Sequence, residues 1–123
     1  MNVLIVDDNE AAADLLRELL ALQDHTARCT YSALQAMEAF AADVFDAALL
    51  DLVLPDLPGG QLARRMREMA GKRPLLLVAV SGFGAQDAGD ANAPGVFDHF
   101  LQKPIDFDAL DRILASSASP STP

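Results

Sequence analysis

Residues 2–9 read NVLIVDDN, an uncharged apolar run that ends in two aspartates. The same arrangement recurs twice: AALLD at 47–51 ends in Asp51, and LLLVAVS at 75–81 ends in Ser81. Short runs that are apolar at nearly every position are typical of strands buried on both faces, and such strands occur in parallel sheets that helices cover on both sides. The sequence therefore predicts a parallel sheet whose strands end in polar side chains.

Helix-like segments alternate with the predicted strands along the chain. The strands are expected at 2–6, 26–29, 47–50, 75–80 and 98–101, and the helices at 10–23, 32–42, 59–70, 85–91 and 106–115. Ser32 is placed to cap the second helix, and Gly71 to end the third. The fourth is weakly encoded, because glycines interrupt it and each glycine costs about 1 kcal/mol relative to alanine. Five consecutive βα units indicate an α/β fold with an open, doubly wound sheet.

The first predicted helix, at 10–23, has one apolar face. On a helical wheel with about 100° per residue, its apolar side chains fall within an arc of roughly 160°, and they are Ala12, Leu15, Leu16, Leu19, Leu20 and Leu22. Charged residues lie opposite, so the helix is expected to pack on the sheet. Leu15 and Leu22 lie at one edge of the arc, where burial is expected to be incomplete. We expect a partner protein to dock on this edge.

The composition excludes several classes of protein. The 123 residues suffice for one domain, expected at 1–116, and the Ser- and Pro-rich segment 117–123 is expected to be a disordered tail. Eighteen acidic and nine basic residues give a net charge of −9, the wrong sign for direct binding of nucleic acid. The single cysteine, Cys29, has no second thiol for a disulfide and no cluster of zinc ligands. No apolar run approaches the roughly 18 residues of a membrane span, and the sequence shows no signal peptide, so we expect a cytoplasmic protein without membrane insertion.

Polar residues follow four of the predicted strands. Asp7 and Asp8 follow the first, Asp51 the third, Ser81 the fourth and Lys103 the fifth. In doubly wound sheets, ligands bind outside the carboxyl ends of the strands, so these side chains are expected to converge. Three clustered carboxylates repel one another unless a cation lies among them, and Mg²⁺ fits an all-oxygen set best. An ammonium and a hydroxyl beside them suit an incoming phosphoryl group. The pattern indicates transfer of a phosphoryl group to a carboxylate.

Each of these residues also has an ordinary structural interpretation. Asp7 and Asp8, followed by Asn9, could cap the first helix, and Asp51, Ser81 and Lys103 are common turn residues. Their joint occurrence at the ends of the first, third, fourth and fifth predicted strands favours a functional site. The sequence contains no phosphate-binding P-loop and no dinucleotide-binding glycine motif.

The motifs of this chain resemble those of the receiver domain of bacterial two-component response regulators, over residues 1–116. The matching segments are VLIVDDN at 3–9, DLVLP at 51–55 with Gly59, SG at 81–82 and FLQKP at 100–104. The resemblance implies a flavodoxin-like (βα)5 fold with strand order 2-1-3-4-5. Two positions depart from the family's frequent pattern: Pro58 where an acidic residue is common, and Phe100 where tyrosine is common.

The resemblance also implies a role for each site residue. Asp51 is the expected phosphoacceptor. Mg²⁺ is expected to bind Asp8 directly, Asp7 partly through water, Asp51, and the backbone carbonyl of Val53. Ser81 and Lys103 are expected to hold the phosphoryl oxygens. Ser81 and Phe100 are expected to form the output switch.

The function that follows is a phosphorylatable signalling module. A histidine kinase or a histidine phosphotransfer protein is expected to phosphorylate Asp51, and an unknown downstream protein is expected to bind the altered surface. We expect no enzyme activity beyond Mg²⁺-dependent self-phosphorylation and self-dephosphorylation. One alternative is a receiver-like interaction module that works without phosphorylation. Another is a small Mg²⁺-dependent hydrolase, which would need a general acid two residues after the nucleophile, where this chain has Val53.

Overall fold

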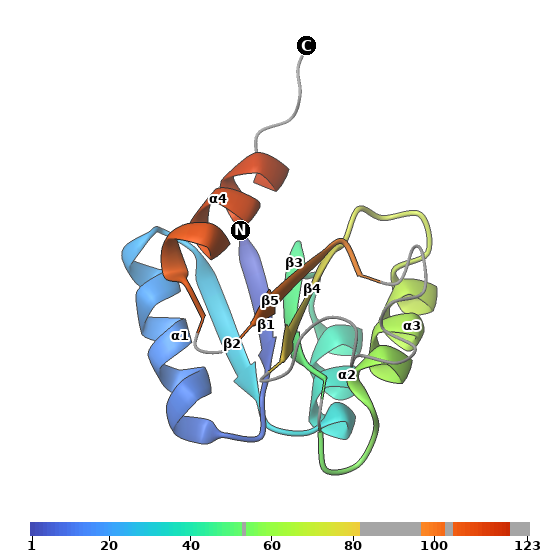
Figure 1. Ribbon diagram of the computed structural model, residues 1–123. Helices are drawn as coiled ribbons and strands as arrows, with labels where there is room; N and C mark the ends of the chain where they lie inside the picture. Colours follow the sequence, from blue (N-terminus) through green and yellow to red (C-terminus); the bar gives the residue numbers. More distant parts are fainter. Residues whose placement is uncertain (53, 82–96, 103–104, 119–123) are drawn as a thin grey trace.

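The computed structural model describes residues 1–52, 54–81, 97–102 and 105–118 (Figure 1). The described residues form strands and helices that alternate along the chain, except that the fourth strand is followed by the fifth with the undescribed residues 82–96 between them. The strands are β1 (Asn2–Val6), β2 (Thr26–Thr30), β3 (Ala47–Asp51), β4 (Leu76–Ser81) and β5 (His99–Gln102), and the helices are α1 (Glu10–Leu22), α2 (Ala33–Ala42), α3 (Gly59–Ala70) and α4 (Phe107–Ala118). Each bound lies within three residues of its predicted position. The helix predicted at 85–91 lies outside the described residues.

The five strands form one parallel sheet with the order β2-β1-β3-β4-β5, which confirms the predicted fold. Helices α1 and α4 cover one face of the sheet, and α2 and α3 cover the other (Figure 1). None of the helices in the described part of the chain is long and apolar enough to span a membrane.

The continuous apolar character of β1 follows from this layered arrangement. Val3 and Ile5 pack with the side chains of α1 and α4, whereas Leu4 and Val6 pack with those of α2 and α3. All four are buried. Because successive side chains of a strand point to opposite faces, a strand between two helical layers needs an apolar residue at every position.

Helix α1 begins at a cap that the sequence leaves ambiguous. Its N-cap residue is Asn9, whose Oδ1 accepts a hydrogen bond from the Ala12 amide at 3.1 Å. The carboxylates of Asp7 and Asp8 are therefore not needed to cap the helix.

The edge of the apolar face of α1 that contains Leu15 and Leu22 is exposed to solvent. Leu15 is 57% exposed and Leu22 is 79% exposed. Incomplete burial of this edge is confirmed.

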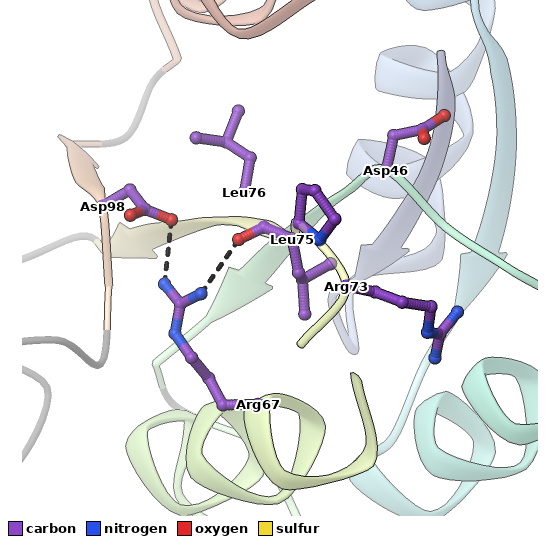
Figure 2. A pocket seen from close by; sticks show the side chains of 7 residues that line it. Asp46, Arg67, Arg73, Leu75, Leu76 and Asp98 are labelled. Carbon is purple, nitrogen blue, oxygen red and sulfur yellow. Dashed lines mark hydrogen bonds and ion pairs between the residues drawn. The ribbon is translucent and has the colours of Figure 1, made fainter. Parts of the chain in front are cut away.

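A side chain from α3 and one from the residue just before β5 hold the amino ends of the last two strands together (Figure 2). Arg67 donates hydrogen bonds to the Leu75 carbonyl at 2.9 Å and to Oδ2 of Asp98 at 2.8 Å. The same Asp98 oxygen accepts from the Leu77 amide at 2.8 Å. These groups border a pocket of about 400 Å³ at the end of the sheet opposite the predicted site. Within this pocket the hydrogen bond between Arg67 and Asp98 links α3 to the start of β5.

Candidate metal centre

Three aspartates lie together at the carboxyl end of the sheet. Asp7 and Asp8 follow β1, and Asp51 ends β3, the strand beside β1. One carboxylate oxygen from each of the three lies within 4.8 Å of the others. The structure thus brings together the three acidic residues that the sequence singled out, because the carboxyl ends of neighbouring parallel strands share one edge.

The three carboxylates repel one another, and a cation bound among them would offset this repulsion. Two unit charges 4.8 Å apart repel by roughly 1 to 3 kcal/mol, depending on the effective dielectric constant. Asp7 is 9% exposed and Asp51 is 7% exposed, whereas Asp8 is exposed to solvent. The donor set consists of oxygen atoms and contains no sulfur or imidazole nitrogen, so it fits Mg²⁺ and does not fit zinc.

Apolar side chains lie behind two of the carboxylates. Asp7 and Asp51 border a cavity of about 10 Å³ that is otherwise lined by Ile5, Val6, Leu16, Leu49, Val80 and Ile105. Hydrocarbon on this side limits how well solvent screens the two charges, which strengthens both their mutual repulsion and their attraction for a cation.

Backbone contacts fix the position of Asp7. Its amide donates to the Thr30 carbonyl at 3.1 Å, and its Oδ1 accepts from the Asn9 amide at 2.9 Å. Asn9 therefore both caps α1 and orients a carboxylate of the candidate site. The type of Asn9 and its position before a helix are the sequence signal of a cap, whereas its hydrogen bond to Asp7 has no such signal.

The backbone after Asp51 is packed tightly against the start of α3. The Leu52 amide donates to the Val80 carbonyl at 3.1 Å, and the Gly59 amide donates to the Leu52 carbonyl at 3.1 Å. A Cβ atom at Gly59 would lie 2.5 Å from the Asp51 carbonyl oxygen and 2.8 Å from Cα of Leu52. Only glycine allows α3 to approach the acceptor backbone this closely.

The structure places the remaining predicted site residues only in part. Ser81 ends β4 and pairs with Gln102 of β5, and its side chain lies outside the described residues. Val53 and Lys103 also lie outside them. Phe100, on β5, is exposed and packs against Phe97 with 5.8 Å between ring centroids.

A groove between α1 and α4 adjoins the three aspartates. It has a volume of about 260 Å³ and is lined by Asp7, Ala12, Leu15, Leu16, Leu19, Ile105 and Phe107. Apart from Asp7 the lining side chains are apolar. The exposed Leu15 therefore belongs to an apolar surface that extends to the acidic cluster.

A family profile described as the response regulator receiver domain matches residues 3–115. The chain belongs to this family. Among curated relatives of this receiver domain, the response regulator MprA of Mycobacterium ulcerans (strain Agy99) is 33% identical over 117 residues, which are 94% of this chain and 47% of MprA. The chain thus spans about half the length of the curated relatives it matches.

Solved structures of other receivers share its fold. The CheY-like receiver domain from Methylobacillus flagellatus is 35% identical, with a TM-score of 0.82 over 95% of this chain and 98% of that one. The response regulator TrrA of Thermotoga maritima, solved in complex with Mg²⁺-BeF, is 21% identical, with a TM-score of 0.82 over 94% of this chain and 97% of that one. At 21% identity, the similarity to TrrA shows a shared fold alone.

Proposed function

We propose that this receiver domain accepts a phosphoryl group on Asp51 from a histidine kinase or a histidine phosphotransfer protein, with Mg²⁺ as cofactor, and that phosphorylation switches a surface that binds a downstream protein. The observation that carries the proposal is the approach of three carboxylate oxygens to within 4.8 Å of one another. Holding like charges this close costs free energy, which a bound cation recovers. A module that did not bind a cation would have no physical need for the cluster.

Asp51 is the nucleophile in this proposal. One of its carboxylate oxygens attacks the phosphorus of the donor phosphohistidine, so that an O–P bond forms and the N–P bond breaks. The imidazole that leaves takes up a proton from solvent. When bound, Mg²⁺ supplies positive charge that stabilises the developing charge on the phosphoryl oxygens.

The other site residues hold the cofactor and the phosphoryl group. Asp8 binds the metal directly, Asp7 acts partly through water, and Asp51 and the carbonyl of Val53 complete the protein's contribution. Ser81 and Lys103 hold the phosphoryl oxygens. The proximity of the three aspartates supports the first two assignments, and the family resemblance supports the others.

The proposed chemistry ends with phosphorylation and dephosphorylation of the protein itself, so we assign no enzyme activity toward another substrate. The partners are a phosphoryl donor protein and a downstream protein, with no direct contact to nucleic acid. For this function we propose that the protein lies in the cytoplasm, where ATP is available to the kinase.

Asp8→Asn is expected to weaken Mg²⁺ binding on the order of 10- to 100-fold, because loss of an outer-shell partner alone has effects of that size. Isothermal titration calorimetry with Mg²⁺ measures the affinity directly. Glu18→Gln, which removes one negative charge from the exposed side of α1, is the matched control and should bind Mg²⁺ as wild type does. Equal affinities for Asp8→Asn and wild type would remove Asp8 from the site.

The groove beside α1 is the proposed docking site of the phosphoryl donor protein. Its apolar wall includes Leu15 and its acidic end includes Asp7. A donor that covers the groove would therefore bury apolar surface while it brings its phosphohistidine to the acidic cluster.

Leu15→Asp is expected to slow transfer from a phosphorylated histidine kinase domain at least tenfold, because a charge would have to be buried in the apolar contact. Phosphorylation by acetyl phosphate, which needs no docking surface, should stay within twofold of wild type in the same variant. Leu34→Asp on α2 is the matched control, since Leu34 is 59% exposed and does not line the groove. Transfer rates that fall equally in the two variants would contradict docking at α1.

Phe100 and Ser81 form the proposed output switch. Phe100 is exposed on β5, one strand away from Ser81 at the end of β4. We expect an aromatic side chain at the surface to change its packing on Phe97 at low cost when Ser81 moves toward the phosphoryl group.

A further inference from the structure

Asp56 contacts a helix that lies far from it in the sequence. Its Oδ1 accepts a hydrogen bond from the Ala33 amide at 2.9 Å, and its Oδ2 accepts one from the Leu34 amide at 2.9 Å. These are the first two amides of α2, which have no acceptor within the helix. The α2 helix thus receives its terminal acceptors from the loop that follows the proposed phosphoacceptor.

The two hydrogen bonds that Asp56 accepts are strong and directional, although the residue is exposed at the surface. The Ala33 amide, followed by the Leu34 amide, lowers the pKa of the Asp56 carboxyl, so the group is ionised throughout the neutral range. A charge on the acceptor strengthens each hydrogen bond, and the positive end of the helix dipole favours a carboxylate here. Because each oxygen has its own donor, the contact fixes the orientation of the carboxylate as well as its distance.

The segment that Asp56 contacts also forms a hydrogen bond with the backbone of Asp7, the first of the two aspartates that follow β1. We call this segment, Thr30–Leu34, the β2–α2 junction. At its start the Thr30 carbonyl accepts from the Asp7 amide at 3.1 Å, and the Thr30 hydroxyl donates to the Ile5 carbonyl at 2.9 Å. The junction is therefore hydrogen-bonded to the backbone of one proposed metal-binding residue and to the loop that follows Asp51.

Other described residues of that loop also attach it to the rest of the protein. Gly59 closes it through the hydrogen bond to the Leu52 carbonyl, and the buried Leu54 packs in the core between the sheet and α2 and α3. The partly buried Leu57 packs against the same core, and Asp56 supplies the loop's hydrogen bonds to the first amides of α2. The loop includes Val53, whose carbonyl is a proposed metal ligand.

We propose that Asp56 is a positioning residue: through the β2–α2 junction it holds the loop after Asp51 at a set distance from the acid pair, and so controls Mg²⁺ affinity and the phosphorylation rate without contacting either group. The proposal rests on the proposed function of the site. A residue that only capped α2 would affect the stability of the helix and leave the Mg²⁺ affinity unchanged.

The decisive comparison is between Asp56→Ala and Ser32→Ala. Ser32 caps the same helix, because its Oγ accepts from the Gln35 amide at 3.2 Å, but its side chain forms no hydrogen bond with the described residues of the loop. Both variants should lower the melting temperature. Only Asp56→Ala should weaken Mg²⁺ binding and slow phosphorylation by acetyl phosphate, each on the order of tenfold. Asp56→Asn, which keeps one acceptor oxygen, should recover part of both losses.

Hydrogen exchange on the metal-free protein separates this proposal from the function it rests on. Asp56→Ala should speed exchange at the amides of Leu54 and Gly59, and Ser32→Ala should not. Faster exchange at these amides in Asp56→Ala, combined with a wild type that neither binds Mg²⁺ nor accepts phosphoryl groups, would overturn the proposed function and leave the mechanical link in place. Equal Mg²⁺ affinity in wild type and Asp56→Ala, or equal losses in Asp56→Ala and Ser32→Ala, would overturn the positioning role.

Discussion

Asp51→Asn is expected to abolish the mass increase that the wild-type protein acquires on incubation with Mg²⁺ and acetyl phosphate. An amide has no ionised oxygen with which to attack phosphorus, and no other carboxylate in the cluster ends a strand between two neighbours as Asp51 does. Intact-mass spectrometry measures the effect directly. The expected change is complete loss, which makes this the largest effect among our predictions.

The stability of the same variant shows whether the loss reflects chemistry or misfolding. Asn is nearly isosteric with Asp, and its neutral side chain relieves repulsion from Asp7 and Asp8. In metal-free solution we therefore expect Asp51→Asn to melt at or above the temperature of wild type. Asp108→Asn, at an exposed position on α4, is the control and should be phosphorylated normally. Full phosphorylation of Asp51→Asn at another residue would refute the assignment.

Gly59→Ala is expected to have the second-largest effect, because the added Cβ would lie 2.5 Å from the Asp51 carbonyl oxygen. The atom it meets belongs to the backbone, so the acceptor strand and α3 must separate. We expect a loss of roughly 1 to 3 kcal/mol in the free energy of unfolding, as for other overpacked sites. Since the displaced backbone is that of Asp51, phosphorylation by acetyl phosphate should also slow at least tenfold.

Gly71→Ala is the matched control for Gly59→Ala. Gly71 follows α3 with φ of +61°, and a Cβ there would meet no atom within 4 Å. The strained backbone should cost about 1 to 3 kcal/mol, a similar loss of stability. Its phosphorylation rate should remain that of wild type, because Gly71 lies at the far end of α3 from Asp51. Urea unfolding and phosphorylation kinetics on the two variants give both quantities. Equal rates in the two variants would show that the close approach at Gly59 serves stability alone.

The positions of the strands and helices could be predicted because their signals are local. Continuous apolar runs at β1, β3 and β4 reflect burial on both faces, and each lies within a residue or so of its predicted position. The proximity of Asp7 and Asp51 could also be predicted, because the carboxyl ends of adjacent parallel strands lie at one edge of a sheet whatever the details of packing.

The exact bounds of the helices were harder to predict from the sequence. Helix α4 runs to Ala118, three residues beyond its predicted end, because Ser and Ala allow either a helix or a loop and no glycine or proline ends the segment before Pro120. The start of α1 illustrates the same ambiguity, since Asp7, Asp8 and Asn9 are all good cap residues and the backbone geometry selects Asn9.

By itself, the sequence determined the order of the elements, the parallel sheet and the three carboxylates at its edge, because these depend on residue type, periodicity and chain order. Only the tertiary structure decided that Asp56 supplies acceptors to α2, that Gly59 touches the backbone of Asp51, and that Leu15 faces a groove. Each of these is a contact between separate segments of the chain. Local pattern carries no information about such contacts, because they depend on how the helices and loops pack against the finished sheet.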